Sequence, residues 1–347
     1  MHMADALLSP AVGGTMWAAA AGLAAYAARK VRQELDGIKV PLMGVLGAFI
    51  FAAQMLNFSI PGTGSSGHLG GGMILAILLG PYAGFITMAS VLTVQALFFA
   101  DGGLLALGCN IFNLGFFPCF IAYPLIFKPI VKDQPSRGRI FLAASLAGIV
   151  SLQLGAFSAV LETVTSGISS LPFKTFVLLM QPIHLAIGAV EGLVTTAVIT
   201  FVWQARPEIL QNAATAQPYR GISIKRVLIG LILAAAVAGG ALSWFASAYP
   251  DGLEWSMFHA SGREELETSD NLHESLAEIQ KKTAILPDYG FKEQASAATN
   301  THGQAKTAWP AVNGGTSVSG LVGAAITLVL VGLVGLSLWL VKRRRQN

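Results

Sequence analysis

Residues 71–100 read GGMILAILLGPYAGFITMASVLTVQALFFA, and this stretch decides the fold. It has no charged side chain, and it is longer than the roughly 20 apolar residues that one membrane-spanning helix needs. The pair Gly80-Pro81, with Gly84 close behind, interrupts the run near its middle. Proline and flanking glycines favour a turn in a segment that would otherwise continue as one helix. The stretch therefore predicts two short helices that cross a membrane in opposite directions.

Other apolar stretches flank this one, and most have the length of a single crossing. They cover residues 11–28, 40–58, 104–127, 140–162, 175–203, 227–248 and 317–341. The chain is 54% hydrophobic and 12% charged, with mean hydropathy +0.62, whereas a soluble domain is about 25% charged. This composition excludes a cytosolic enzyme, and the continuous apolar runs argue against a β-barrel, whose strands alternate. We expect an all-α integral membrane protein with about nine transmembrane helices.

Basic side chains gather in four segments that nine spans place on one side of the membrane. These segments hold 16 of the 22 lysines and arginines, at Arg29, Lys30, Arg32, Lys39, Lys128, Lys132, Arg137, Arg139, Arg206, Arg220, Lys225, Arg226, Lys342, Arg343, Arg344 and Arg345. Loops rich in lysine and arginine remain cytoplasmic. The sequence thus predicts a multi-pass protein of the cell (inner) membrane, with its amino terminus outside and its carboxyl terminus in the cytoplasm. Since the positive charge follows topology, we expect membrane lipid and no nucleic acid as a partner.

One long polar segment, residues 249–316, falls outside the membrane in this topology. A short amphipathic helix is expected over about 262–282, because four apolar residues are spaced for one helical face: Leu266, Leu272, Leu276 and Ile279. Residues 294–316 have the composition of a flexible linker. The predicted organisation is a seven-span unit over 1–205, a cytoplasmic linker over 206–226, and a two-span hairpin over 227–347 with the external loop 249–316.

Nitrogen donors collect at the predicted outer face. The chain begins Met1-His2, so an α-amine, a backbone amide and an imidazole lie within two residues, and the loop 57–70 carries His68 on the same face. Such nitrogens suit first-row divalent metals, and four of them in tetragonal or square-planar geometry favour Ni²⁺ or Cu²⁺. The alternative is that His2 is an ordinary terminal residue and that His68 is merely solvated. The candidate metal ligands are therefore Met1, His2 and His68.

Glycines crowd the loop around His68. Gly62, Gly64 and Gly67 match a dinucleotide-binding fingerprint on paper, but we expect no strand or βαβ unit around them. A phosphate-binding P-loop would need a lysine where His68 stands, so we expect no ATP hydrolysis by this chain and no bound cofactor. The glycines instead indicate a re-entrant loop whose backbone packs closely beside the amino terminus.

Several polar side chains lie within or beside the predicted spans, where unpaired polar groups are costly. Gln54 and Asn57 flank the His68 loop, where either could accept a ring N–H from a ligating histidine or join neighbouring helices. The same two alternatives, pocket lining or helix–helix hydrogen bonding, apply to Gln95, Asn110 and Asn113. His184 and Glu191 are two helical turns apart on one face, so they could relay ions or form a structural pair.

Several ordered motifs resemble one family. They read MH at 1–2, DALLSP at 5–10, the glycine-rich loop 57–72, FADGG at 99–103, LGCN at 107–110 and PIHLAIG at 182–188. Over about residues 1–205 the chain resembles the CbiM/NikM substrate-specific component of cobalt and nickel energy-coupling-factor transporters. The sequence PDGLEW at 250–255 resembles the signature of the two-span CbiN/NikN-like partner, so the carboxyl-terminal part resembles a fused copy of it.

The resemblance implies a transporter subunit that is not an enzyme. It implies that Ni²⁺ or Co²⁺ is bound outside by the Met1 amine, the His2 amide and imidazole, and the His68 imidazole. A membrane coupling (T) component and cytoplasmic ATP-binding subunits are the implied partners. The alternative from the residues alone is a stand-alone secondary transporter or channel for a divalent cation, for which only His184 and Glu191 approach the required mid-membrane charges. The sequence does not rank nickel against cobalt.

Overall fold

A computed structural model describes residues 2–132, 134–168, 171–219, 223–262, 270–292 and 309–344. It is predominantly helical. The helices before the linker 206–226 are α1 (Pro10–Glu34), α2 (Lys39–Gln54), α3 (Gly72–Leu79), α4 (Pro81–Phe99), α5 (Leu107–Ile111), the π-helical stretch η2 (Phe112–Phe127), α6 (Lys128–Val131), α7 (Arg137–Ser166) and α8 (Phe173–Ala205). The remaining ones are α9 (Pro207–Thr215), α10 (Lys225–Gly240), α11 (Gly252–Ser261), α12 (Asn271–Thr283) and α14 (Gly314–Arg344).

Six described helices are long and apolar enough to cross a membrane, which makes the chain a multi-pass membrane protein. They are α1, α4, the continuous helix Leu107–Val131, α7, α8 and α14. Two further apolar helices, α2 and α10, have 16 residues each, or about 24 Å along the axis.

The predicted break in the stretch 71–100 is confirmed. Helix α3 ends at Leu79, Gly80 has a positive φ of 80°, and α4 begins at Pro81, where proline fits the first turn of a helix. With eight residues, or about 12 Å, α3 is much shorter than a full crossing.

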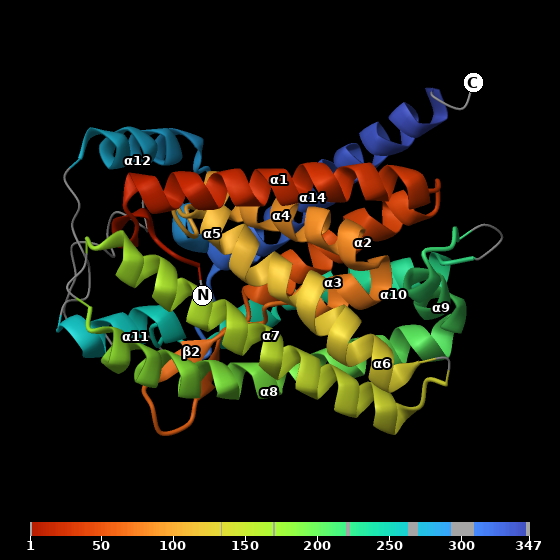
Figure 1. Cartoon of the computed structure of the whole chain (residues 1–347), viewed down its shortest axis with the longest axis horizontal. Coiled ribbons are helices and arrows are strands. Elements are labelled where there is room, and N and C mark those ends of the chain that lie inside the picture. Colours follow the sequence, from red (N-terminus) through yellow and green to blue (C-terminus); the bar gives the residue numbers. More distant parts are fainter. Residues whose placement is uncertain are drawn as a thin grey trace.

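Helix α2 forms the centre of the bundle and is buried from Leu42 to Gln54. Helices α10 and α14, from the carboxyl-terminal part, pack along it, while α7 and α8 pair with each other on another side (Figure 1). Gly239 and Gly320 let α10 and α14 touch backbone to backbone, since a Cβ on Gly320 would lie 2.4 Å from the Gly239 carbonyl oxygen. Small residues permit such close helix crossings. The carboxyl-terminal hairpin is therefore integrated into the same helical bundle.

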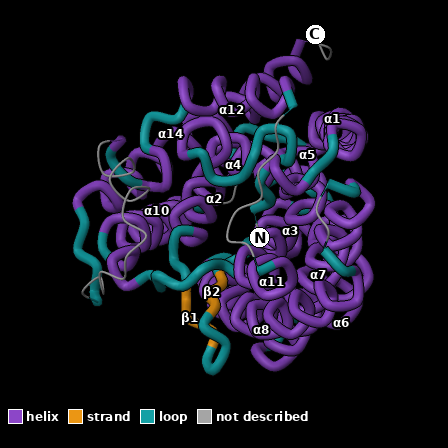
Figure 2. Tube along the Cα trace, turned by 90° about the vertical axis from the view of Figure 1, so that its left-hand side faces the viewer, coloured by secondary structure: helices purple, strands orange, loops and turns teal. Residues whose placement is uncertain are grey.

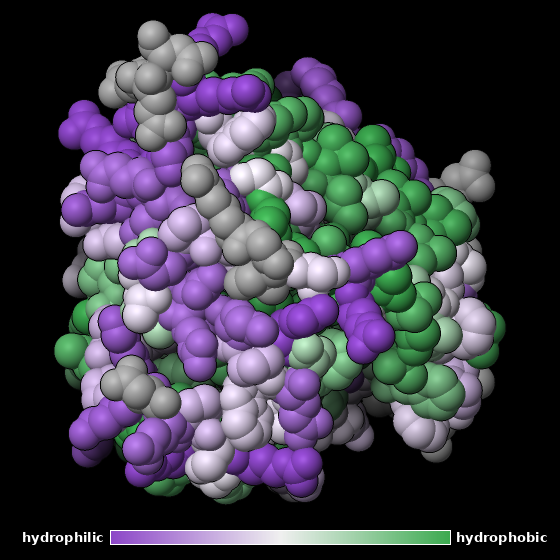
Figure 3. All heavy atoms as spheres, turned by 90° about the vertical axis from the view of Figure 1, so that its right-hand side faces the viewer, coloured by the Kyte–Doolittle hydropathy of each residue, from purple (hydrophilic) through white to green (hydrophobic). Residues whose placement is uncertain are grey.

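The two ends of the bundle differ in character (Figure 1). One end carries β2, α11 and α12, whereas the other carries α6, α9 and the last turn of α14. The second end also holds the described members of the four basic segments; Arg220 and Arg345 lie outside the described residues. Figure 3 shows hydrophilic side chains across the middle of this end, with hydrophobic ones along one side.

Two short strands form within the glycine-rich loop, which corrects the expectation that no strand surrounds it. Strands β1 (Phe58–Ile60) and β2 (Ser65–Gly67) pair antiparallel, with Ser59 opposite Ser66. Gly62 and Gly64 occupy the turn with positive φ, which glycine adopts without strain. Ser66 also forms an isolated parallel bridge to Asp251, just before α11, and Figure 2 shows α11 beside β2. The described residues show no βαβ unit at this loop.

In the long polar segment 249–316, the described residues form two α-helices before α14, where one was expected. Helix α11 begins at Gly252, and Asp251 before it forms a capping box with Glu254. Helix α12 covers only the second part of the predicted 262–282 helix, and Leu266 lies outside the described residues. Within the predicted linker 294–316, residues 294–308 also lie outside them, and α14 already begins at Gly314.

Candidate metal-binding site

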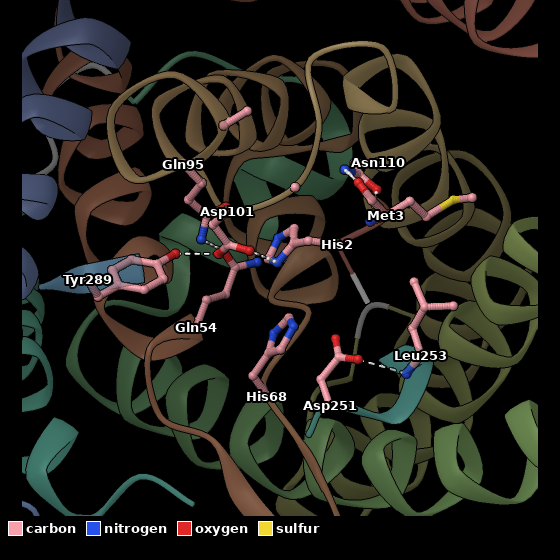
Figure 4. Close-up of polar contacts among 12 residues, drawn as sticks. His2, Met3, Gln54, His68, Gln95, Asp101, Asn110, Asp251, Leu253 and Tyr289 are labelled. Carbon is pink, nitrogen blue, oxygen red and sulfur yellow. Dashed lines mark hydrogen bonds and ion pairs between the residues drawn. The ribbon is translucent and has the colours of Figure 1, made fainter. Parts of the chain in front are cut away.

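The two predicted histidine ligands meet at the end of the bundle that carries α11 and α12. The rings of His2 and His68 are stacked, with centroids 5.0 Å apart and planes inclined by 4° (Figure 4). The third predicted ligand, Met1, lies outside the described residues. Residues 66 positions apart in the chain are thus brought together as the sequence predicts.

The segment that follows His2 is held by the main chain and by one asparagine. The Met3 amide N–H donates to Asn110 Oδ1 at 2.8 Å, and Asn110 Nδ2 donates to the Met3 carbonyl at 3.3 Å. The Gly103 N–H donates to the same carbonyl at 2.9 Å. Met3 is fully buried, so the chain next to His2 is anchored in the protein interior.

Asp101 contacts the His2 ring, which sequence reasoning missed. His2 Nδ1 lies 3.0 Å from Asp101 Oδ1, and His2 Nε2 is buried with no hydrogen-bond partner among the described residues. The hydroxyl of Tyr289 donates to the other oxygen of Asp101 (Figure 4). Burial alone would raise the pKa of Asp101, but His2 and the Tyr289 hydroxyl hold it below its usual value. Asp101 is therefore an ionised carboxylate that orients His2.

The backbone around Asp101 explains how it reaches this position. Ala100 ends α4 in the left-handed region with φ 55°, and Gly102 follows with φ 79°. A Cβ on Gly102 would lie 2.8 Å from Asn110 Nδ2 and 3.3 Å from His2 Cβ. The FADGG motif thus turns sharply and passes directly against the amino-terminal segment, where only glycine fits.

His68 is buried immediately after β2. Its Nδ1 lies 3.0 Å from the Leu69 carbonyl, which can accept the ring proton, so Nε2 is the ring nitrogen that could coordinate a metal. Burial is the largest influence on the ring and lowers the pKa of His68 to about 3, so the imidazole is neutral at physiological pH. A neutral imidazole is the form that binds a metal.

Gln54 contacts the loop backbone and Gln95 on α4, which favours the second of its two predicted roles, a hydrogen bond that joins neighbouring helices. Its Nε2 donates to the Gly70 carbonyl at 2.8 Å, and its Oε1 accepts from Gln95 Nε2 at 2.8 Å. Asn57 uses its main-chain carbonyl to accept the Ser247 N–H at 2.8 Å. The ring partners are instead Asp101 for His2 and the Leu69 carbonyl for His68.

Asn110, Asn113, His184 and Glu191 all make contacts with other parts of the protein. Asn113 donates to Glu162 at 2.8 Å and also contacts the Met3 sulfur, while Asn110 holds the Met3 backbone. His184 Nδ1 is 2.8 Å from the Met180 carbonyl within its own helix. Glu191 accepts backbone N–H groups of the His68 loop. The described contacts thus favour structural roles for these residues.

A cavity of about 1060 Å³ opens beside the two histidines. Gln54 and Asn57 line it, whereas Gln95, Asn110 and Asn113 do not. Its wall includes carboxylates from both parts of the chain, at Asp5, Asp101, Asp251, Glu254, Glu274 and Asp288. Within the described ranges, no three side chains of His, Cys, Asp or Glu are grouped to hold a metal ion.

Comparison with protein families gives two matches that together cover most of the chain. Residues 2–209 match CbiM, described as the cobalt uptake substrate-specific transmembrane region. Residues 225–343 match the PDGLE domain.

Individual proteins agree with these matches. A protein of Haloquadratum walsbyi, provisionally named a metal transport protein, is 39% identical over 212 residues, which are 60% of this chain and 93% of that protein. The fused nickel transport protein NikMN of Rhodobacter capsulatus is 32% identical over 245 residues, 65% of this chain and 68% of that one. The crystal structure of a transition metal transporter superposes with TM-score 0.54 at 29% identity, covering 64% of this chain and all of the other.

Proposed function

Because the chain belongs to the family of cobalt uptake substrate-specific transmembrane regions and carries a fused PDGLE domain, we propose that it captures Ni²⁺ or Co²⁺ for an ATP-driven uptake transporter of the energy-coupling-factor type. Membership makes it a transporter membrane component, in agreement with its relatives that are named as metal transport proteins. The ion is cargo, and a membrane coupling component and cytoplasmic ATP-binding subunits supply the energy.

The proposal rests above all on the stacking of His2 on His68 at one end of the bundle. The four donors are the Met1 amine, the His2 amide, the His2 ring and the His68 ring. Only Nδ1 of His2 closes a six-membered chelate ring with the amide nitrogen of its own residue. That atom lies 3.0 Å from Asp101, so the incoming ion replaces this contact, and the deprotonated amide makes binding stronger at higher pH.

We further propose that the chain crosses the membrane nine times with the histidines outside. The bundle supports this topology because the basic segments share the end opposite His2 and His68. Lysine and arginine at that end mark it as cytoplasmic. Helix α3, together with the loop before it, accounts for one of the nine crossings. Its carboxyl end reaches the linker 206–226, because the hydroxyl of Tyr219 in that linker donates to the Leu78 carbonyl at 3.0 Å.

Calorimetric titration of Ni²⁺ and Co²⁺ into the purified chain tests the metal site. Residues added before Met1, His2→Ala and His68→Ala should each abolish high-affinity binding, whereas the same extension placed after Asn347 should leave it intact. Tight binding by the protein extended at its amino terminus would refute the amine as a ligand.

Uptake by cells tests the coupling to partners. Uptake should require co-expression of the coupling component and the ATP-binding subunits. Equal uptake without them would favour the stand-alone transporter or channel instead. That alternative relied on His184 and Glu191, which bond to the Met180 carbonyl and to the loop amides, respectively.

A further inference from the structure

Glu191 places its carboxylate on the backbone just beyond His68. Its Oε2 accepts the Gly70 N–H at 2.8 Å, and the Gly71 N–H lies 3.0 Å from Oε1 and 3.2 Å from Oε2. The side chain is only 2% exposed. A carboxylate that accepts backbone N–H groups makes stronger hydrogen bonds than a neutral acceptor. Helix α8 thus holds the main chain at Gly70 and Gly71, two and three residues after the predicted metal ligand His68.

A second helix, α2, binds the same peptide. Gln54 on α2 donates to the Gly70 carbonyl at 2.8 Å, and Gln95 on α4 in turn donates to Gln54. The segment after His68 is therefore hydrogen-bonded to both α2 and α8. Its two glycines need this support, because residues without side chains are the most mobile when unheld.

The space around Glu191 leaves its carboxylate little freedom. Helix α7 lies against it at Gly148, where a Cβ would come within 3.2 Å of Glu191 Cγ. A Cβ on Gly70 would lie 3.5 Å from Glu191 Oε2 and 3.2 Å from Leu152. Glycines on both sides thus let the carboxylate reach the loop amides closely.

We propose that Glu191 is a positioning residue that sets the His68 imidazole for the transported ion. The inference rests on the proposed function, because it concerns the same metal site. Glu191 touches the backbone after His68 and acts on the ion through it. Partners that hold metal ligands in place typically change metal affinity 10- to 100-fold when they are lost.

Glu191→Gln is the variant that tests this role, because it keeps the size of the side chain. The amide oxygen can accept one loop N–H, but its NH₂ group then faces the other. Nickel affinity should fall about 10- to 100-fold by calorimetry. Gln153→Ala is the matched control, since Gln153 on α7 bonds the Gln181 carbonyl on α8 at 2.8 Å without touching the loop. The control should bind nickel as the wild type does.

A double-variant comparison separates positioning from a purely structural role. His68→Ala leaves weak residual nickel binding by the other donors, and adding Glu191→Gln should weaken this residual binding no further. Ligand-field absorption of the nickel-loaded Glu191→Gln protein should also shift toward that of His68→Ala. Wild-type affinity in Glu191→Gln, an undiminished effect in the His68→Ala background, or equal weakening by Gln153→Ala would overturn the inference. A wild-type chain that binds neither Ni²⁺ nor Co²⁺ would instead overturn the proposed function, and this inference with it.

Discussion

Asn110 should control metal binding without touching the ion, because it anchors the chain beside His2. The variant Asn110→Ala removes the oxygen that accepts the Met3 N–H at 2.8 Å. The Met3 carbonyl keeps the Gly103 N–H at 2.9 Å, so one buried donor loses its partner. Met3 is fully buried and water does not reach it.

The expected magnitude follows from that single donor. A buried N–H left without a partner costs about 1–3 kcal/mol. We take the conformation of the amino terminus that binds the metal to be destabilised by about 2 kcal/mol. Nickel affinity then falls roughly 30-fold, since about 1.4 kcal/mol corresponds to a factor of ten. The effect should exceed that of most surface substitutions, which stay within about 0.5 kcal/mol.

Calorimetric titration of Ni²⁺ into Asn110→Ala measures this loss directly. Cys109→Ala is the matched control, because Cys109 is an equally buried neighbour that is free of any disulfide. Hydrogen exchange of the amino-terminal segment should rise in Asn110→Ala only. Wild-type nickel affinity in Asn110→Ala, together with weak binding by His68→Ala, would show that Asn110 does not set the position of the amino terminus.

Two further predictions concern the carboxyl-terminal part. Gly252→Ala would bring a Cβ within 2.5 Å of Ile183 Cγ2, so α11 should shift away from α8. Thermal unfolding should then show a loss of about 1–3 kcal/mol in the stability of the protein. An unchanged melting temperature would contradict this packing of α11 on α8. Partial burial lowers the pKa of His273, but Asp270 and two backbone carbonyls outweigh it and leave the pKa above the usual 6.5. The charged ring therefore stabilises α12 below pH 6.5, and this contribution is lost as pH rises through the raised pKa. Hydrogen exchange in α12, corrected for the intrinsic pH dependence of exchange, should be faster at pH 8 than at pH 6. The reverse order would refute the stabilisation of α12 by charged His273.

The helical architecture was largely predictable because the signals are local. Apolar runs, the Gly80-Pro81 break and the clustering of basic residues can be read from neighbours in the chain, and the break lies where it was predicted. The meeting of His2 with His68 followed from the predicted topology, because that topology puts the amino terminus and the loop 57–70 on the same face of the membrane. The hairpin of β1 and β2 was missed, because three-residue strands carry too short a pattern to recognise.

The contacts that hold the site in place depended on the tertiary structure. Asp101 stands in the FADGG motif, but no sequence pattern linked it to His2 or to Tyr289, which lies 188 residues further on. Glu191 suggested an ion relay or a structural pair with His184, yet it binds the loop after His68. Hydropathy and charge are summed over neighbouring residues, so the sequence alone determines that the chain is a membrane protein and which segments gather at each end of the bundle. Which carboxylate meets which ring or amide depends on how distant helices pack, and only the folded chain decides that.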